Sequence, residues 1–228
     1  LNGESGVGKE VLSQFIHQES TRNSGPYVAI NCAAIPENML EAALFGYEKG
    51  AFTGAIKSTI GKFEQAQGGT LLLDEVSEMD LSLQAKLLRV IQERQVERLG
   101  STKLIDLDVR IIATTNRNLK KEVADKRFRE DLFYRLNVFP LTVPALRSRP
   151  ADIIPIAEKL IQLYSRAAGQ KILLSSAASD LLLKHNWPGN VRELDNVIQR
   201  ALILKQGNEI KKDDIMLEMN VSIAGVSQ

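Results

Sequence analysis

Apolar residues in the first part of the chain form two kinds of run, and the two kinds alternate. The first run at helical spacing contains Val11, Leu12, Phe15 and Ile16, and it predicts a helix after Lys9. Similar runs predict further helices at 39–46, 62–66, 83–91, 119–125 and 130–136. Short apolar runs predict strands at 27–31, 70–73, 109–114 and 138–143, and residues 1–2 resemble the tail of another strand. This alternation predicts an α/β fold with a parallel sheet and helices on both faces.

The pattern changes after Pro144. Helical spacing then covers 153–168, 177–185 and 191–204, with no strand expected between these runs. We therefore expect an α/β subdomain at 1–146 followed by a smaller all-helical lid at 147–206. The polar tail at 207–228 is expected to begin a linker toward a DNA-binding domain that is absent from this chain.

A glycine-rich loop stands between the first predicted strand and the first predicted helix. It fits the G-x-x-x-x-G-K core of a phosphate-binding loop, and its residues are Gly3, Glu4, Ser5, Gly6, Val7, Gly8 and Lys9. Glycines let backbone N–H groups converge on phosphate oxygens, and the helix N-terminus adds its positive end. Lys9 is expected to reach the β- and γ-phosphates. Glu10 replaces the usual Ser or Thr metal ligand, and a plain glycine-rich turn is the simpler alternative.

Two adjacent carboxylates, Asp74 and Glu75, end the predicted strand at 70–73. This arrangement resembles a Walker B strand, whose carboxyl end is where open α/β sheets bind ligands. We expect Asp74 to hold Mg²⁺ through water and Glu75 to polarise the attacking water of ATP hydrolysis. Two carboxylates that merely cap a strand are the structural alternative.

The composition excludes several classes of protein. The chain is 44% hydrophobic and 25% charged, as in an ordinary globular protein, and its formal net charge of +1 gives no basis for nucleic-acid binding. Cys32 is the only cysteine, so no intrachain disulfide can form and a reducing, cytoplasmic compartment fits best. No apolar run approaches the roughly 20 residues of a membrane span, so no membrane partner is expected.

A hexapeptide between the phosphate loop and the Walker B strand is the most specific feature of the chain. Its residues are Gly50, Ala51, Phe52, Thr53, Gly54 and Ala55. The two glycines let the chain reverse sharply, and an aromatic side chain on such a tip suits contact with a macromolecule. With the motifs above, this hexapeptide makes the chain resemble the central AAA+ ATPase domain of bacterial sigma-54-dependent transcriptional activators. The resemblance extends from Gly3 to Leu204.

The resemblance implies roles for further residues. Asn31 is similar to the asparagine that holds the catalytic glutamate aside, and Asn116 to the first sensor of the γ-phosphate; turn formation at a strand end is the alternative for both. Arg129 and Arg135 resemble arginine fingers given to a neighbouring subunit, with surface ion pairs to Glu130 and Asp131 as the alternative.

At the lid, Arg192 resembles the second sensor. It follows Asn190, which can cap the helix, and precedes Glu193, which completes a box-like cap. The family usually has Glu at position 10, whereas Val7 stands where it commonly has Thr. A polar hairpin or loop is expected at 96–107, and the polar segment 95–106 resembles a second surface loop that packs beside the hexapeptide.

The resemblance therefore implies an ATPase that uses ATP and Mg²⁺ and assembles into a hexameric or heptameric ring. Its hexapeptide, mainly Phe52 and Thr53, is expected to push on the sigma-54 factor of RNA polymerase and allow promoter opening. DNA contact is expected only through a domain outside this chain. The context around 47–49 and 61–67 looks similar to flagellar-gene response-regulator activators. A ring-shaped unfoldase or DNA motor, and a non-hydrolysing nucleotide switch, are the two rival functions.

Overall fold

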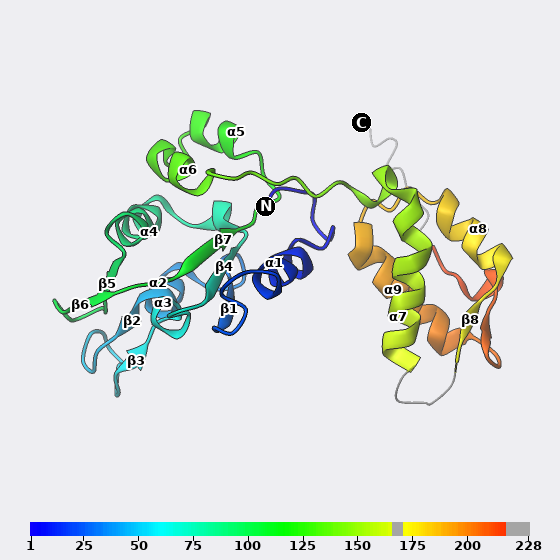
Figure 1. Cartoon of the computed structure of the whole chain (residues 1–228), viewed down its shortest axis with the longest axis horizontal. Helices are drawn as coiled ribbons and strands as arrows, with labels where there is room; N and C mark the ends of the chain where they lie inside the picture. The colour runs from blue at the N-terminus through cyan, green and yellow to red at the C-terminus, as the bar shows by residue number, and fades with distance from the viewer. Residues whose placement is uncertain (166–170, 218–228) are drawn as a thin grey trace, which may run out of the picture. The chain divides into compact units, whose positions relative to one another are not determined.

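The chain folds into two compact units (Figure 1). The computed structural model describes residues 1–165 and 171–217. The first unit comprises Leu1–Glu4 and Gly8–Val143, and the second comprises Ser5–Val7 and the described part of Pro144–Gln228. Each unit has its own hydrophobic core.

A parallel sheet forms the centre of the first unit. Its strands are β1 (Tyr27–Asn31), β4 (Thr70–Asp74) and β7 (Arg110–Ala113), in the order β1-β4-β7. The first four residues of β4 are fully buried, as expected for a central strand covered on both faces. Asn2 forms parallel bridges with both Thr115 and Thr142, so the phosphate loop leaves from the side of the sheet next to β7. The predicted parallel sheet is confirmed.

One strand prediction needs correction. Residues 138–143 form only the bridge at Thr142, because Pro140 lacks an N–H and Val138 and Phe139 are each 79% exposed. The predicted strand at 27–31 exists as β1, but only Ile30 is buried in it, because β1 lies at one edge of the sheet.

Helices flank this sheet, as the spacing of apolar residues predicts. They are α1 (Lys9–Gln18), α2 (Glu37–Phe45), α3 (Lys62–Gln65), α4 (Leu81–Glu93), α5 (Leu119–Ala124) and α6 (Glu130–Leu136). Helix α4 starts where the Asp80 carboxylate accepts hydrogen bonds from the backbone N–H groups of Ser82 and Leu83, at 2.7 and 3.0 Å. It packs against α6, and both contribute fully buried leucines, Leu87 and Leu132, to the core.

Two antiparallel hairpins extend from the first unit. One pairs β2 (Gly46–Tyr47) with β3 (Thr59–Ile60), and the hexapeptide lies between these strands. The other pairs β5 (Gln95–Glu97) with β6 (Leu104–Asp106), so the segment expected at 96–107 as a hairpin or loop is a hairpin.

The second unit is built on three helices, α7 (Ile153–Ser165), α8 (Ser176–Lys184) and α9 (Asn190–Leu204). They pack around Trp187, the only tryptophan of the chain, which is fully buried. This helical lid agrees with the sequence pattern over the described residues; residues 166–168 of the first predicted run lie outside them.

Two expectations for this unit are wrong. A two-residue strand, β8 (Leu173–Leu174), lies between α7 and α8 and pairs in parallel with β9 (Glu209–Ile210). Strand β9 is part of the tail assigned to a linker, and Ile210 and Ile215 of that tail are buried in the lid core. Two apolar residues in a polar stretch give too short a pattern to predict this packing.

Candidate functional site

The phosphate loop has the backbone that its glycines allow. Gly6 and Gly8 have φ angles of 77° and 100°, a region that favours glycine. Lys9 begins α1 and is only 6% exposed; its Nζ donates to the carbonyls of Gly3 and Glu4, at 2.9 and 3.2 Å. Glu10 follows in the first turn with its side chain exposed.

The two carboxylates at the end of β4 form the centre of a polar cluster. The Asp74 carboxylate accepts hydrogen bonds from Thr114 Oγ1 and from Asn31 Nδ2, the latter at 3.1 Å. Glu75 has a left-handed backbone with φ of 54°. Its carboxylate lies 3.5 Å from Lys9 Nζ and accepts from the backbone N–H of Asn116 at 3.0 Å. The structure therefore brings Lys9, Asp74, Glu75, Asn31 and Asn116 together.

Asn31 and Asn116 occupy this cluster differently from the arrangement that the resemblance implies. The Asn31 amide donates to Asp74, not to Glu75, and its Oδ1 accepts from the N–H groups of Ala33 and Ala34, as in a local turn. Asn116 contacts Glu75 through its backbone, and its side chain is exposed. The turn contacts of Asn31, which are the alternative to a switch role, are thus present.

Sequence reasoning missed Thr114. Its hydroxyl donates to the Asp74 carboxylate and accepts from the backbone N–H of Glu75 at 3.2 Å, so it orients the Asp74 carboxylate and holds the backbone of Glu75. The available signal was a buried hydroxyl two positions before Asn116, at the carboxyl end of the next strand.

The donor set suits Mg²⁺ held together with phosphate. Among the described residues there is no group of three or more His, Cys, Asp or Glu side chains that could enclose a metal. One carboxylate such as Asp74, with its oxygens already oriented by Thr114 and Asn31, fits a magnesium ion that keeps several waters and binds phosphate oxygens.

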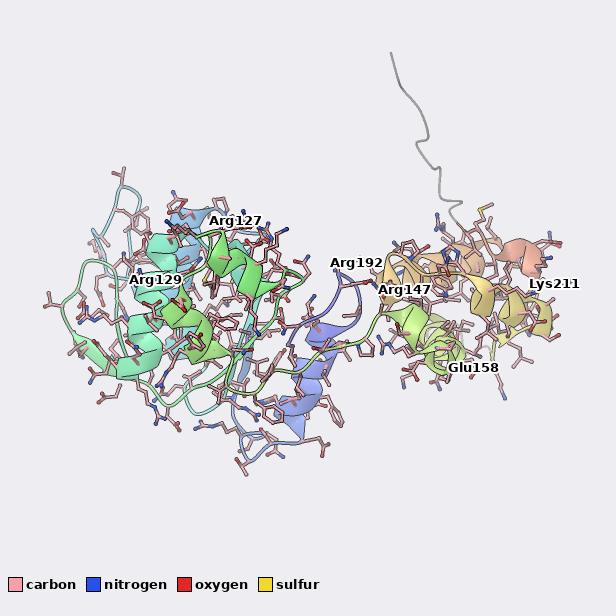
Figure 2. The ribbon with its side chains drawn as sticks, turned by 90° about the horizontal axis from the view of Figure 1, so that it is seen from above. Arg127, Arg129, Arg147, Glu158, Arg192 and Lys211 are labelled. Atoms are coloured by element: carbon pink, nitrogen blue, oxygen red, sulfur yellow. The ribbon has the colours of Figure 1, made fainter. Side chains whose placement is uncertain are left out.

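The two candidate arginine fingers are engaged outside this cluster. Arg129 is the N-cap residue of α6, as expected for a helix entry, and it forms a two-point ion pair with Asp131 at 3.0 and 2.7 Å (Figure 2). The pKa of Asp131 is held below its usual value chiefly by this pair. Arg135 donates to the carbonyl of Ile91 at 3.4 Å. The ion pair with Asp131, one of the alternatives, is thus present.

In the second unit, Arg192 lies in the first turn of α9, where Nη1 donates to Ser5 Oγ at 2.8 Å (Figure 2). The predicted cap is only half right. Gly189, not Asn190, is the N-cap residue, and Glu193 accepts from the Gly189 N–H at 2.8 Å. Asn190 is directed elsewhere because its side chain bonds the backbones of Leu146 and Ser5.

The hexapeptide forms the turn between β2 and β3. Gly50 and Gly54 have φ angles of 85° and 102°, and the Gly50 N–H donates to the Ala55 carbonyl at 2.9 Å. Phe52 is 46% exposed, with its ring against Tyr47 at a centroid distance of 5.0 Å. The aromatic side chain therefore faces water on a closed turn and is not tucked into the core.

The second hairpin packs beside the hexapeptide, as expected. The Leu99 N–H donates to the Gly46 carbonyl, and the Glu48 N–H to the Leu99 carbonyl, at 3.0 and 2.9 Å. Arg98 joins the elements by donating to Glu48 and, at two points, to Glu64 of α3. Sequence reasoning missed Arg98, because a single arginine in a charged hairpin carries no local signal.

Within the described ranges, the helices are too short or too polar to cross a membrane.

Comparison with known proteins identifies the family. A model described as the Sigma-54 interaction domain matches residues 1–142, and one described as an AAA+ ATPase lid domain matches residues 147–224. The response regulator protein FleR of Pseudomonas aeruginosa is 62% identical over 218 residues, which are 95% of this chain and 46% of that protein. The transcriptional regulatory protein FlbD of Caulobacter vibrioides is 55% identical over 95% of this chain and 48% of its own length.

A solved structure shows the same fold. NtrX from Brucella abortus, crystallised in complex with ATP, superimposes with a TM-score of 0.86 at 38% identity, over all of this chain and 50% of that one. The chain thus spans about half the length of the relatives it matches. It belongs to the sigma-54 interaction family of AAA+ ATPase domains, with an AAA+ helical lid.

Proposed function

We propose that this chain hydrolyses ATP and uses the energy to remodel sigma-54 RNA polymerase, so that the promoter opens and transcription starts. The observation that carries this proposal is that one unit holds the cluster of Lys9, Asp74 and Glu75 and also presents an exposed Phe52 on the hexapeptide. ATPase chemistry belongs to the first unit, and the second unit is the lid, which includes Ile210 and Ile215 of the tail.

The residues of the cluster divide the work of phosphoryl transfer. Lys9 and the backbone N–H groups of residues 3–9 bind phosphate oxygens, and Glu10 follows them in the first turn of α1. Glu75 orients and polarises the attacking water, while Asn31 and Asn116 report the γ-phosphate. Mg²⁺, held through Asp74, supplies neutralisation of the phosphate charge.

Oligomerisation completes the site. Arg129 and Arg135 act on the nucleotide of a neighbouring subunit in a hexameric or heptameric ring, and Arg192 senses nucleotide from the lid. An arginine supplied in trans is worth about 10³–10⁵ in rate. The two-point pair of Arg129 with Asp131 is compatible with this role, because the pair is exposed and therefore weak, so that Arg129 can exchange Asp131 for a phosphate partner.

The partner is the sigma-54 factor. Phe52 and Thr53 make the contact, supported by the other four residues of the hexapeptide, Gly50, Ala51, Gly54 and Ala55. DNA is bound only through a domain outside this chain, and the protein works in the reducing cytoplasm as part of a two-component system. The assignment to flagellar genes stays a prediction.

The first experiment measures ATPase activity per subunit against protein concentration, for the wild type, Arg129→Ala and the control Arg22→Ala. Arg22 forms the same two-point pair with an exposed aspartate, Asp108, at another place in the first unit. We expect specific activity to rise with concentration, and Arg129→Ala to bind ATP but lose at least about 10³-fold in rate. If the activity does not depend on concentration and Arg129→Ala retains it, the proposal of a site shared between subunits is wrong. Turnover at background in an assembled ring would favour the non-hydrolysing switch.

A second experiment tests the partner. Phe52→Ala is expected to abolish sigma-54 binding and leave ATPase activity intact, while Ile56→Ala, an exposed apolar residue just outside the hexapeptide, binds normally. Unchanged sigma-54 binding by Phe52→Ala would favour an unfoldase or DNA motor.

A further inference from the structure

The carbonyl groups of the phosphate loop all bond to protein. Those of Gly3 and Glu4 accept from Lys9 Nζ in the first unit. The next three accept from residues of the second unit, to which Ser5–Val7 belong. Arg149 donates to the Val7 carbonyl at 2.7 Å, and the backbone N–H groups of Val191 and Arg192 donate to the Gly6 carbonyl at 2.9 and 3.3 Å.

The Ser5 carbonyl is held by a side chain, Asn190. Its Nδ2 donates to the Ser5 oxygen at 3.0 Å, and its Oδ1 accepts from the Leu146 N–H at 2.8 Å. The orientation of the amide is unambiguous, because Leu146 N–H can only donate and the Ser5 carbonyl can only accept. Asn190 is fully buried, and its φ of 54° is one that asparagine tolerates better than most residues. Asn190 is thus both fully buried and held in a backbone conformation that is unfavourable for most residues.

The geometry of the peptide bond means that these carbonyl contacts also fix the directions of the N–H groups. A trans peptide is planar, so the N–H of one residue points opposite to the C=O of the residue before it. Fixing the carbonyls of Ser5, Gly6 and Val7 therefore turns the N–H groups of residues 6, 7 and 8 to the other side of the loop. Those N–H groups are the ones that a phosphate-binding loop offers to its ligand.

The Ser5–Gly6 peptide depends most on such a restraint. Gly6 has no Cβ and therefore rotates more freely than its neighbours, so the plane of this peptide can turn over at little cost. The Gly6–Val7 peptide has two backbone donors on its carbonyl, and the Val7–Gly8 peptide has a charged one. Only the Asn190 amide is seen to restrain the Ser5 carbonyl among the contacts described above.

We propose that Asn190 is a positioning residue that sets the Ser5–Gly6 peptide so that the Gly6 N–H faces the phosphates of the nucleotide. This role rests on the proposed binding of ATP by the loop. It differs from a helix cap, the role that sequence reasoning assigned to Asn190, since α9 is capped by Glu193 and Gly189 without it.

Two variants separate positioning from folding. Asn190→Asp keeps the acceptor for Leu146 and the shape of the side chain, but sets a carboxylate oxygen against the Ser5 carbonyl. Asn190→Gly accepts the positive φ without strain and deletes both bonds. The control is Asn208→Asp, an exposed residue of the same unit that undergoes the same change of charge.

The measurement is an amide NMR titration of the chain labelled with ¹⁵N-glycine, using inorganic tripolyphosphate and then ATP. In the wild type and Asn208→Asp we expect the Gly6 and Gly8 amides to shift on binding. In both Asn190 variants the Gly6 shift should be lost while the Gly8 shift remains, because Arg149 still holds the Val7 carbonyl. Affinity for both ligands should fall at least about tenfold, which corresponds to the loss of one hydrogen bond to a charged group.

The signals of the other glycines report whether each variant is folded. If Asn190→Asp does not fold, Asn190→Gly alone tests the positioning role. A Gly6 shift of wild-type size in Asn190→Gly would overturn the positioning role and leave ATP binding standing. A wild type that binds neither ligand would overturn the proposed function and this inference with it.

Discussion

Replacing Arg98 should loosen the base of the hexapeptide hairpin. The Arg98 guanidinium donates to both Glu64 oxygens, at 2.8 and 2.7 Å, and to Glu48 at 2.9 Å. It thereby ties the second hairpin to α3 and to Glu48, which lies two positions before the hexapeptide. Glu48 also accepts from Ser58, and this bond, followed by Arg98, lowers the pKa of its carboxyl.

The size of the effect follows from burial. Arg98 is 21% exposed and Glu64 13%, so Arg98→Ala leaves the Glu64 carboxylate with little water in place of a two-point partner. Exposed pairs are worth about 0–1 kcal/mol, and breaking buried ones costs about 3–5 kcal/mol. We expect Arg98→Ala to cost about 2–3 kcal/mol, nearly all of it through Glu64, because Glu48 is 37% exposed and adds little.

Urea unfolding followed by two signals is the assay. Fluorescence of Trp187 reports the second unit only, whereas far-ultraviolet circular dichroism reports both. Arg98→Ala should weaken the transition seen by circular dichroism more than the one seen by Trp187. Arg98→Lys, which keeps the charge but has no planar fork, should fall between the wild type and Arg98→Ala.

The matched control is Arg89→Ala on α4. Arg89 pairs with Glu93 at 3.1 Å, but its side chain is 61% exposed, so its loss should cost under about 0.5 kcal/mol. If Arg98→Ala destabilises the chain no more than Arg89→Ala does, the reasoning from burial is refuted.

Three further predictions follow from other contacts. Gly6→Ala sets a Cβ 2.5 Å from the Gly189 carbonyl oxygen at a φ of 77°, whereas Gly207→Ala has a φ of 76° with open space around the Cβ. Backbone strain should lower the free energy of unfolding of both variants by about 1–2 kcal/mol, as measured by thermal unfolding. The close contact should destabilise Gly6→Ala further and weaken its binding of ATP, whereas Gly207→Ala should bind ATP normally. Arg127 lowers the pKa of Glu122, so this carboxyl stabilises the fold above its unfolded pKa of about 4.3 and loses that effect as pH falls through the lowered pKa. Glu122→Gln should therefore reduce the fall of the melting temperature between pH 6 and pH 3. An unchanged pH dependence of the melting temperature would contradict this prediction. Burial, followed by the charges of Asp74 and Glu75, raises the pKa of Cys32 to about 12, so a thiol reagent at pH 8 should label it only after unfolding, and rapid labelling of the folded chain would contradict this.

Local patterns predicted most of the elements correctly, and they put Asp74 and Glu75 at the end of a strand, where the structure has them. The phosphate loop and the end of β4 are each defined by a few consecutive residues, so local spacing alone places Lys9 at the start of a helix and Asp74 at the carboxyl end of a strand. The predicted strand at 138–143 is wrong for a reason that is also local, because Pro140 lacks the N–H that a strand needs and stands within the apolar run.

Residues that act at a distance in the sequence could not be predicted. Thr114 meets Asp74 across 40 positions, Arg98 meets Glu48 across 50, and Asn190 meets Ser5 across 185. Each is an ordinary polar residue in an ordinary local context, and only the folded chain identifies its partner. The role of Asn190 was assigned to the nearest helix for that reason.

The contact of Lys9 with Glu75 has a consequence for how the site fills. A nearly buried ammonium needs a counter-charge, and here the nearby carboxylate is the one expected to activate water. In the proposed mechanism, an arriving γ-phosphate therefore competes with Glu75 for the Lys9 ammonium group, so that nucleotide binding exchanges one anion for another. The Glu75 carboxylate then becomes available as the base only when the γ-phosphate has arrived. In the absence of nucleotide, the contact with Lys9 would keep the Glu75 carboxylate from abstracting protons. The neutral side chain of Glu75→Gln would leave Lys9 free to bind the nucleotide without that competition.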